Sequence, residues 1–275
     1  MKKIFYLILT IIFLVLIISS LIFFLLKKEE NSLANEEGLV DVAIEPEKII
    51  PDQVEVPILV YHHVREFSQN DSENDRTFIV PKADLEELFK YLRDNNFTSI
   101  SFKNLADYFS GDFIMPPKPV IISFDDGLIS QYENALPLLK QYNLTATFFI
   151  FTNPVGKSKN YMDWENIMEL DSLGMEIGSH GHYHLFFDRI SDQELEKEIF
   201  GSKKIIEENL GKKIYALAYP FGNYNEDIIT LVKEAGFVIG RGITNGVIHK
   251  SDSLYYLDSF FSTSSLVRFK YIIDQ

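Results

Sequence analysis

The chain has 275 residues, of which 46% are apolar, and a length of this order suffices for one sizeable hydrophobic core. Its formal net charge is −14 and its basic residues are scattered, whereas surfaces that bind nucleic acid concentrate Lys and Arg, so the composition argues against nucleic acid as a partner. The absence of cysteine excludes disulfides, thiolate metal ligands and cysteine nucleophiles, so that any metal must be held by His and carboxylate side chains.

The first element is an apolar run over residues 4–26 that contains no charged side chain. As a helix it is long enough to cross the roughly 30 Å hydrocarbon layer of a bilayer. A cleaved signal peptide is the alternative, but its apolar region usually spans about 7–15 residues and ends at a small-residue cleavage site. We therefore predict that residues 1–28 form an uncleaved transmembrane anchor. Lysines flank the run on both sides, so they indicate its orientation only weakly.

Residues 29–55 have the composition of a solvated linker. They are acidic, contain no aromatic residue and are interrupted by Pro46 and Pro51. Such a segment cannot bury enough apolar surface to fold by itself. We expect it to join the anchor to a catalytic domain at residues 56–275.

Short β-rich runs alternate with amphipathic runs after residue 55. The predicted strands are 56–61, 120–124, 146–151, 175–179, 215–219, 237–240 and 254–260. Leucine and phenylalanine recur at helical spacing from Leu85 to Leu92, Ser191 and Glu194 form a capping box, and Asn225 precedes a helix that Gly236 ends. About seven strands alternating with helices predict a parallel α/β barrel.

Polar side chains follow four of these strands where each strand ends. They are His62 with His63, Asp125 with Asp126, the three histidines 180, 182 and 184, and the turn Pro220-Phe221-Gly222. In parallel barrels the carboxyl ends of the strands meet on one face, and that face carries the active site. We therefore expect these residues to share one pocket.

The adjacent acids Asp125 and Asp126 cannot both stay ionised in a semi-buried pocket unless a cation compensates them. A metal would allow one carboxylate to be a ligand and the other to accept a proton from water. The alternative is an ordinary surface turn, because Asp-Asp-Gly is favourable turn chemistry.

The separation of His180 and His184 places two imidazoles on the same side of a helical turn, which is typical of metal ligands. Together with Asp126 they would form a set of two histidines and one carboxylate. Such a set suits Zn²⁺, and also Co²⁺, Ni²⁺ or Fe²⁺. His182, between the two, is interpreted as a structural or substrate-facing residue.

Three motifs resemble those of the polysaccharide deacetylases of the NodB-homology type, carbohydrate esterase family four. Residues 123–127 read SFDDG, similar to that family's TFDDG, and residues 180–184 resemble its His-Ser/Thr-x-x-His motif, with Gly181 replacing the hydroxyl residue. Residues 219–225 look like its Pro-Tyr-Gly turn. The motifs occur in the family's order, and the resemblance extends from residue 56 to the C-terminus.

The resemblance implies a distorted (β/α)₇ barrel and hydrolysis of an acetamide with the help of a divalent metal. Asp125 resembles the family's base, while Asp126, His180 and His184 resemble its metal ligands. A backbone N–H near Phe221 would help to hold the oxyanion.

Two positions depart from the family pattern. Ala218 stands where most members carry an Arg that steadies the base, which predicts a less constrained base here. Val247-Ile248-His249 is a poor match to the Leu-x-His motif that supplies the acid in many members. Residues 57–63 instead resemble a strand of the poly-β-1,6-N-acetylglucosamine deacetylase subgroup, which implies that His62 is the acid and that His63 points away.

The sequence thus predicts a membrane-bound, extracytoplasmic hydrolase that removes acetyl groups from a β-linked N-acetylglucosamine polymer, either an exopolysaccharide of the biofilm kind or peptidoglycan. Trp164 and Tyr183 are predicted as further substrate contacts. One alternative is an O-acetyl esterase with the same metal site. Another is a catalytically silent module that binds glycan in the barrel groove. Protein partners are not indicated by any motif.

Overall fold

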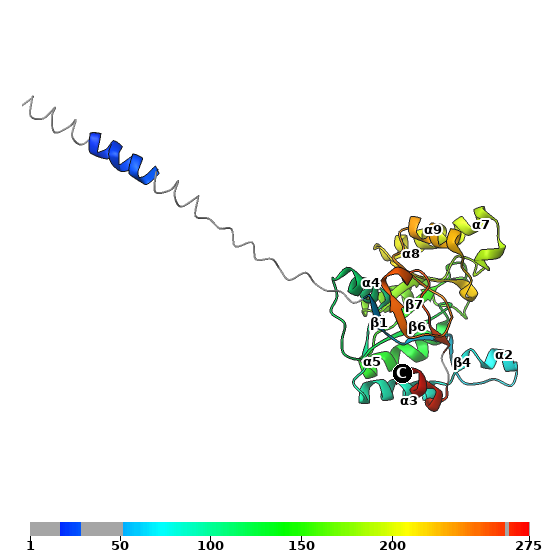
Figure 1. The fold of residues 1–275 in the computed structure, drawn as a ribbon. Coiled ribbons are helices and arrows are strands. Elements are labelled where there is room, and N and C mark those ends of the chain that lie inside the picture. Colours follow the sequence, from blue (N-terminus) through cyan, green and yellow to red (C-terminus); the bar gives the residue numbers. More distant parts are fainter. Residues whose placement is uncertain (1–16, 29–51, 262–263, 275) are drawn as a thin grey trace, which may run out of the picture. The chain divides into compact units, whose positions relative to one another are not determined.

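The protein is represented by a computed structural model that describes residues 17–28, 52–261 and 264–274 (Figure 1). Residues 17–28 are helical and belong to a separate unit from residues 52–274. Most of the predicted anchor, residues 1–16, and most of the predicted linker, residues 29–51, lie outside the described residues. Within the described ranges, no helix is both long and apolar enough to span a membrane.

A curled parallel sheet forms the centre of the larger unit (Figure 1). Its hydrogen-bonded order is β10 (Ile239–Arg241), β9 (Ala216–Ala218), β8 (Glu176–Ser179), β7 (Thr147–Ile150), β6 (Pro119–Phe124), β2 (Ile58–Tyr61) and β12 (Phe260–Phe261). All neighbouring pairs in this order are parallel, and β5 (Thr98–Ser99) pairs with the start of β6. Every residue of β2, β6 and β7 is buried, as expected for parallel strands covered on both faces.

The two edges of the sheet approach each other through the residues before β12. Leu257 forms a parallel bridge with Arg241 of β10, and Phe260 then pairs with Leu59 of β2. The predicted strand 254–260 is therefore wrong over most of its length. The chain turns there, with Tyr256 N donating to Ser253 O at 3.1 Å, so only its last residue belongs to β12.

The helices α3 (Lys82–Asp94) and α5 (Leu136–Tyr142) lie together (Figure 1) and, like most of the helices, pack against one face of the sheet, whereas Phe102 and Leu105 pack against the other face. As predicted, α3 buries its leucine and phenylalanine stripe, and Ser191 with Glu194 caps α7 (Asp192–Glu196). Asn225 caps α9 (Glu226–Glu234) through a bond to Ile228 N. The other helices are α2 (Glu73–Arg76), α4 (Phe102–Ser110), α6 (Trp164–Ser172), α8 (Ser202–Leu210) and α10 (Leu266–Ile273).

Two π-helical turns interrupt the regular helices. They are η1 (Gln131–Ala135), which leads into α5, and η3 (Lys197–Gly201), which joins α7 to α8. Such turns often occur at functional sites, because the extra residue redirects side chains. Short 3₁₀ turns are η2 (Phe187–Arg189), η4 (Pro220–Gly222) and η5 (Ser251–Ser253).

Five short strands were not predicted, one of which is β5. β1 (Gln53–Glu55) pairs antiparallel with β11 (Ile248–Lys250), so the last residues of the predicted linker are part of the folded unit. β3 (His63–Val64) pairs with β4 (Ile79–Val80) and closes the loop that carries α2. Strands of two or three residues are too short to produce a recognisable alternation of apolar and polar side chains.

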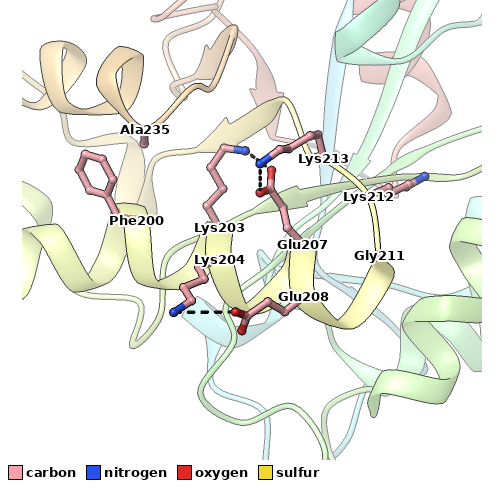
Figure 2. Close-up of a pocket in the computed structure, with 9 residues that line it drawn as sticks. All are labelled: Phe200, Lys203, Lys204, Glu207, Glu208, Gly211, Lys212, Lys213 and Ala235. Carbon is pink, nitrogen blue, oxygen red and sulfur yellow. Dashed lines mark hydrogen bonds and ion pairs between the residues drawn. The ribbon is translucent and has the colours of Figure 1, made fainter.

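The outer surface of α8 carries a shallow hollow of about 560 Å³ (Figure 2). Most of its charges are paired with one another: Lys204 with Glu208, and both Lys203 and Lys213 with Glu207, while Lys212 pairs with Asp171 outside the hollow. Lys203 also donates to Ile214 O, which ties α8 to the chain leading into β9. This network fixes α8 against the sheet.

Candidate metal and catalytic site

The predicted residues converge on one cavity of about 480 Å³ at the carboxyl ends of the parallel strands. All four strand ends that the sequence singled out contribute to its lining. The lining residues are His62, His63, Arg65, Asp75, Phe78, Asp125, Asp126, His180, His184, Tyr219, Phe221, Gly222, Ile243 and Phe261.

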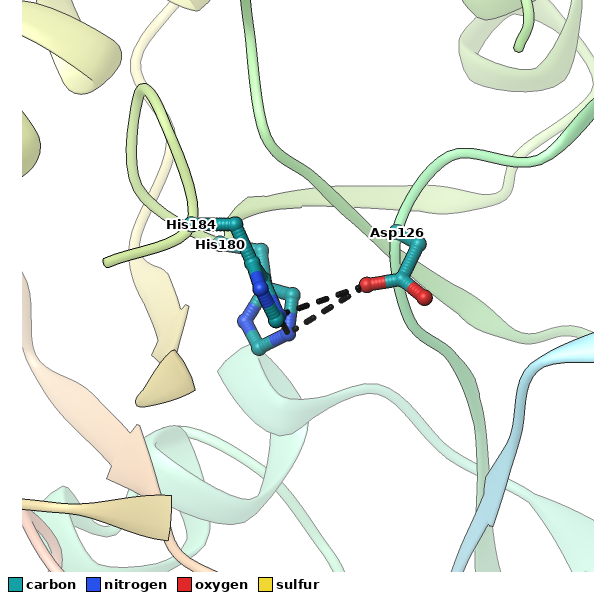
Figure 3. Close-up of side chains that lie close together, drawn as sticks. All are labelled: Asp126, His180 and His184. Carbon is teal, nitrogen blue, oxygen red and sulfur yellow. Dashed lines mark hydrogen bonds and ion pairs between the residues drawn. The ribbon is translucent and has the colours of Figure 1, made fainter. Parts of the chain in front are cut away.

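Asp126, His180 and His184 face one another across a gap of metal-binding size (Figure 3). Asp126 Oδ1 lies 3.5 Å from His184 Nε2 and 3.8 Å from His180 Nε2. The two Nε2 atoms are 3.2 Å apart. One carboxylate oxygen and two imidazole nitrogens therefore converge, as the sequence predicted.

The electrostatics of His180 suit a metal ligand. Its Nδ1 lies 2.8 Å from Ala218 O and must carry the proton, so Nε2 presents a lone pair to the gap. Burial lowers the pKa of His180 to about 3, which keeps the ring neutral at pH 7. The main chain at the end of β9 thus sets the tautomer.

The environment of the Asp126 carboxylate also suits a metal ligand. Its Oδ1 is buried and has no hydrogen-bond partner among the described residues. Burial, and then the charge of Asp125, raise the pKa of Asp126 to about 7. A bound cation would satisfy the oxygen and offset both effects, so these residues fit a divalent metal.

Our prediction that residues 180–184 form a helical turn was wrong. The segment is not helical. His180 follows β8 directly, and Gly181 and His184 adopt positive φ values of 83° and 62°. The two rings therefore meet because the chain reverses between them, and not because they lie one turn apart on a helix.

Asp125 forms a buried ion pair with Arg241, the last residue of β10. Arg241 NH2 donates to both carboxylate oxygens of Asp125, at 2.7 and 2.6 Å. Arg241 is 1% exposed and Asp125 is 3% exposed. Burial alone would raise the pKa of Asp125, but Arg241, His180 and His62 lower it below its usual value. Asp125 is thus a constrained carboxylate rather than part of a surface turn.

This ion pair shows that our prediction of a less constrained base was wrong. Ala218 of β9 and Arg241 of β10 are register partners on adjacent strands. The Arg that pairs with Asp125 therefore comes from the strand next to the one that carries Ala218. Arg241 follows the predicted strand 237–240 directly, so the rule that polar residues mark strand ends could have found it.

His62 lies on the other side of Asp125, with Nε2 4.0 Å from Asp125 Oδ2. Its ring stacks on the ring of Phe261, with 5.7 Å between the ring centroids. It forms a T-shaped pair with the ring of Phe78, with 5.0 Å between the centroids. Burial lowers the pKa of His62 to about 4, although Asp125 acts to raise it. His63, which we expected to point away, also contributes to the cavity lining.

Gln131, on the π-helical turn η1, is a site residue that sequence reasoning missed. It is fully buried, and its Nε2 donates to the carbonyl oxygens of both His62 and Asp125. Asn134 on the same turn donates to Val64 O at 2.9 Å. The turn therefore ties the end of β2 to the end of β6, which carry His62 and Asp125.

Only some of the residues predicted to contact the substrate or the oxyanion line the cavity. Phe221, at φ 58°, and Gly222 line the cavity as predicted, whereas Pro220, Tyr183 and Trp164 are not among the lining residues. The roles predicted for these five residues stay predictions.

Two other histidines have structural partners. His182 bonds to Thr152 Oγ1 at 2.6 Å, in keeping with the structural interpretation. His249 is buried against Val56 O at 2.9 Å, in the β1–β11 ribbon, and is not among the cavity-lining residues.

Comparisons with known proteins agree on one family. The family described as polysaccharide deacetylase matches residues 114–240. The poly-β-1,6-N-acetyl-D-glucosamine N-deacetylase of Staphylococcus aureus strain MRSA252 is 26% identical over 233 residues, which cover 77% of this chain and 80% of that protein.

Two solved structures have a similar fold. A polysaccharide deacetylase from Bacillus cereus has a TM-score of 0.69 at 25% identity, over 80% of this chain and 69% of that one. The deacetylase PplD of Streptococcus pyogenes, in complex with acetate, has a TM-score of 0.71 at 23% identity, over 78% and 94% of the two chains.

Removing Arg241 should destabilise the fold strongly, because Asp125 would be left buried and unpaired. We expect Arg241→Met to lower the free energy of unfolding by about 3–5 kcal/mol, measured by urea denaturation. The double variant Arg241→Met/Asp125→Asn should recover part of the loss, since no unpaired charge remains. Equal losses in the single and double variants would contradict the pairing.

The raised pKa of Asp126 predicts a pH dependence in metal-free protein. The native carboxyl keeps its proton up to about pH 7, whereas the unfolded chain releases it near the usual value of 3.8. The native state therefore binds more protons between these values, and the contribution of Asp126 to stability falls as the pH rises. Unfolding of chelator-treated wild type should show this fall relative to Asp126→Asn. Parallel curves would refute the raised pKa.

Proposed function

Because this chain belongs to the polysaccharide deacetylase family, we propose that it hydrolyses N-acetyl groups of N-acetylglucosamine units in a polysaccharide and releases acetate. The observation that carries the proposal is that a possible metal-binding cluster and a buried carboxylate lie next to each other in one cavity. The cluster of Asp126, His180 and His184 lies beside the ion-paired Asp125. Amide hydrolysis with metal assistance needs a ligand set and a proton acceptor next to it.

Asp126, His180 and His184 would hold the metal, for which we propose Zn²⁺, because the donors are two neutral imidazoles and a carboxylate. Co²⁺, Ni²⁺ and Fe²⁺ fit the same donors. When bound, the ion would polarise the acetyl carbonyl and acidify the attacking water. The fold of the domain would be the distorted (β/α)₇ barrel of the NodB type, of which the curled sheet is the central part.

Asp125 would accept the proton of the attacking water. Arg241 keeps that carboxylate ionised and fixes its orientation through two hydrogen bonds. His62 would donate a proton to the leaving amine. Its Nε2 lies 4.0 Å from Asp125 Oδ2, beyond direct hydrogen-bonding distance, so the proton accepted by Asp125 would reach His62 through one bridging water. The backbone N–H of Phe221 would contribute to the oxyanion site, with Pro220 and Gly222 shaping the turn.

The substrate we favour is a β-1,6-linked polymer. Support comes from the Staphylococcus aureus relative, whose name states that polymer, and from residues 57–63, which resemble the first strand of that subgroup. Tyr183 and Trp164 would contact sugar units beyond the cavity. O-acetyl ester hydrolysis and silent glycan binding are the competing functions.

We also propose that residues 1–28 anchor the protein in the cell membrane as a single span, with residues 29–52 as linker and the catalytic domain outside the cell. The uncharged run of residues 4–26 supports this arrangement, as does a polymer substrate that lies outside the cell.

Incubation of the zinc-loaded protein with a β-1,6-linked N-acetylglucosamine oligomer should release acetate, and chelation should stop the release. Asp125→Asn should reduce the rate by about 10²–10⁴-fold, because the proton acceptor is lost. Asp227→Asn changes an exposed carboxylate in the first turn of α9, and should leave the rate unchanged. Acetate release from hexa-N-acetylchitohexaose, measured in parallel, tests whether the protein requires the β-1,6 linkage.

Two outcomes would refute the amide assignment. Release of acetate from O-acetylated polymer alone would identify an esterase. Unchanged glycan binding without acetate release from any of these substrates, in wild type and Asp125→Asn alike, would identify a binding module.

Membrane anchoring is checked by fractionation of cells that produce the full chain. We expect the full chain in the membrane fraction, resistant to high salt, and a chain that begins at residue 29 in the soluble fraction. External protease should degrade the catalytic domain in intact spheroplasts. Recovery of the full chain in soluble form, shortened at its N-terminus, would instead identify a cleaved signal peptide.

A further inference from the structure

Glu198 is a buried carboxylate beneath the loop that carries the two histidine ligands. It lies on the π-helical turn η3 and is 0% exposed. Its two oxygens accept separate backbone hydrogen bonds, Oε2 from His182 N and Oε1 from Tyr183 N, each at 2.8 Å. The carboxylate therefore holds the middle of the segment that separates His180 from His184.

The other side of this loop is held by the end of β7. Thr152 N donates to Gly181 O at 3.1 Å, and Asn153 N donates to His182 O at 2.9 Å. The loop carbonyls thus face the chain after β7, while the loop amides face Glu198. Without Glu198, two amides would be left without their partners, and the positive φ of His184 would lose its support.

Gly181 fits closely against the same carboxylate. A Cβ at position 181 would overlap Glu198 Oε2, and the φ of 83° is one that side chains other than glycine rarely adopt. The site can therefore hold Gly181 but no hydroxyl residue while Glu198 occupies its present position. This accounts for the glycine where the family's second motif has Ser or Thr.

We propose that Glu198 is a positioning residue for the metal: by binding the amides of His182 and Tyr183, it fixes the loop conformation that brings His184 Nε2 beside His180 Nε2 and Asp126. This inference rests on the proposed metal site. Groups that orient ligands from behind typically change metal affinity by about 10–100-fold when they are removed.

Glu176 offers a matched control at the opposite end of the same strand, β8. It also accepts two backbone amides, Phe102 N at 2.9 Å and Lys103 N at 3.0 Å, together with the hydroxyl of Thr147. Its loss should therefore weaken the fold by a mechanism similar to the loss of Glu198. Glu176 lies at the start of β8 and is not among the cavity-lining residues.

The test measures Zn²⁺ affinity of full-length wild type, Glu198→Gln and Glu176→Gln by competition with a chromogenic chelator. Unfolding of the metal-free proteins is followed in parallel. Glu198→Gln replaces one accepting oxygen by an NH₂ group that faces an amide donor, so we expect the dissociation constant to rise by about 10–100-fold. Glu176→Gln should lose stability and keep the wild-type zinc affinity.

Glu198→Asp provides a second variant in case Glu198→Gln does not fold. It keeps the charge but withdraws the carboxylate by one methylene, and should also weaken zinc binding. Wild-type affinity in either folded Glu198 variant would overturn the inference, as would equal losses of affinity in the Glu176 and Glu198 variants. Failure of wild type itself to bind zinc would instead refute the proposed metal site.

Discussion

Two adjacent carboxylates at the end of one strand, one buried and one half-buried, impose the constraint on which the site depends. Asp125 and Asp126 follow β6 directly, and burial together with the charge of Asp125 raises the pKa of Asp126. The fold compensates only one of them with its own cation, through the buried pair of Asp125 with Arg241. Asp126 is left with an unsatisfied oxygen that faces two neutral imidazoles. In the proposed mechanism, this asymmetry distinguishes Asp125 as the proton acceptor from Asp126 as the metal ligand.

The surrounding structure serves mainly to hold backbone segments in place. The register of β9 and β10 brings Arg241 to Asp125, and the carbonyl of Ala218 sets the tautomer of His180. The two π-helical turns act on the strand ends in complementary ways. Gln131 donates to carbonyls beside His62 and Asp125, while Glu198 accepts amides between His180 and His184. The positions of His180 and His184, the proposed ligands, are thus supported by hydrogen bonds of residues outside the proposed metal site.

Much of this arrangement could be predicted from the sequence, because local patterns encode it. Apolar runs marked the six central strands to within about two residues, and polar residues after them marked the cavity. The pairing of His180 with His184 was correct although its helical explanation was wrong, since spacing does not distinguish a helical turn from a tight loop. Gln131 and Glu198 were missed because their roles depend on contacts between distant segments, whereas Arg241 was missed although it directly follows a predicted strand. Gln131 and Glu198 in particular occur in sequences that read as ordinary amphipathic helix.

The central claim is that one divalent ion binds between Asp126, His180 and His184, beside Asp125. Anomalous X-ray diffraction from crystals soaked in Zn²⁺, recorded on both sides of the zinc absorption edge, tests it most directly. The account predicts a single strong peak within bonding distance of Asp126 Oδ1 and the two Nε2 atoms, with Asp125 close by and still paired with Arg241. A peak held by other side chains, or none at this cluster, would contradict the account.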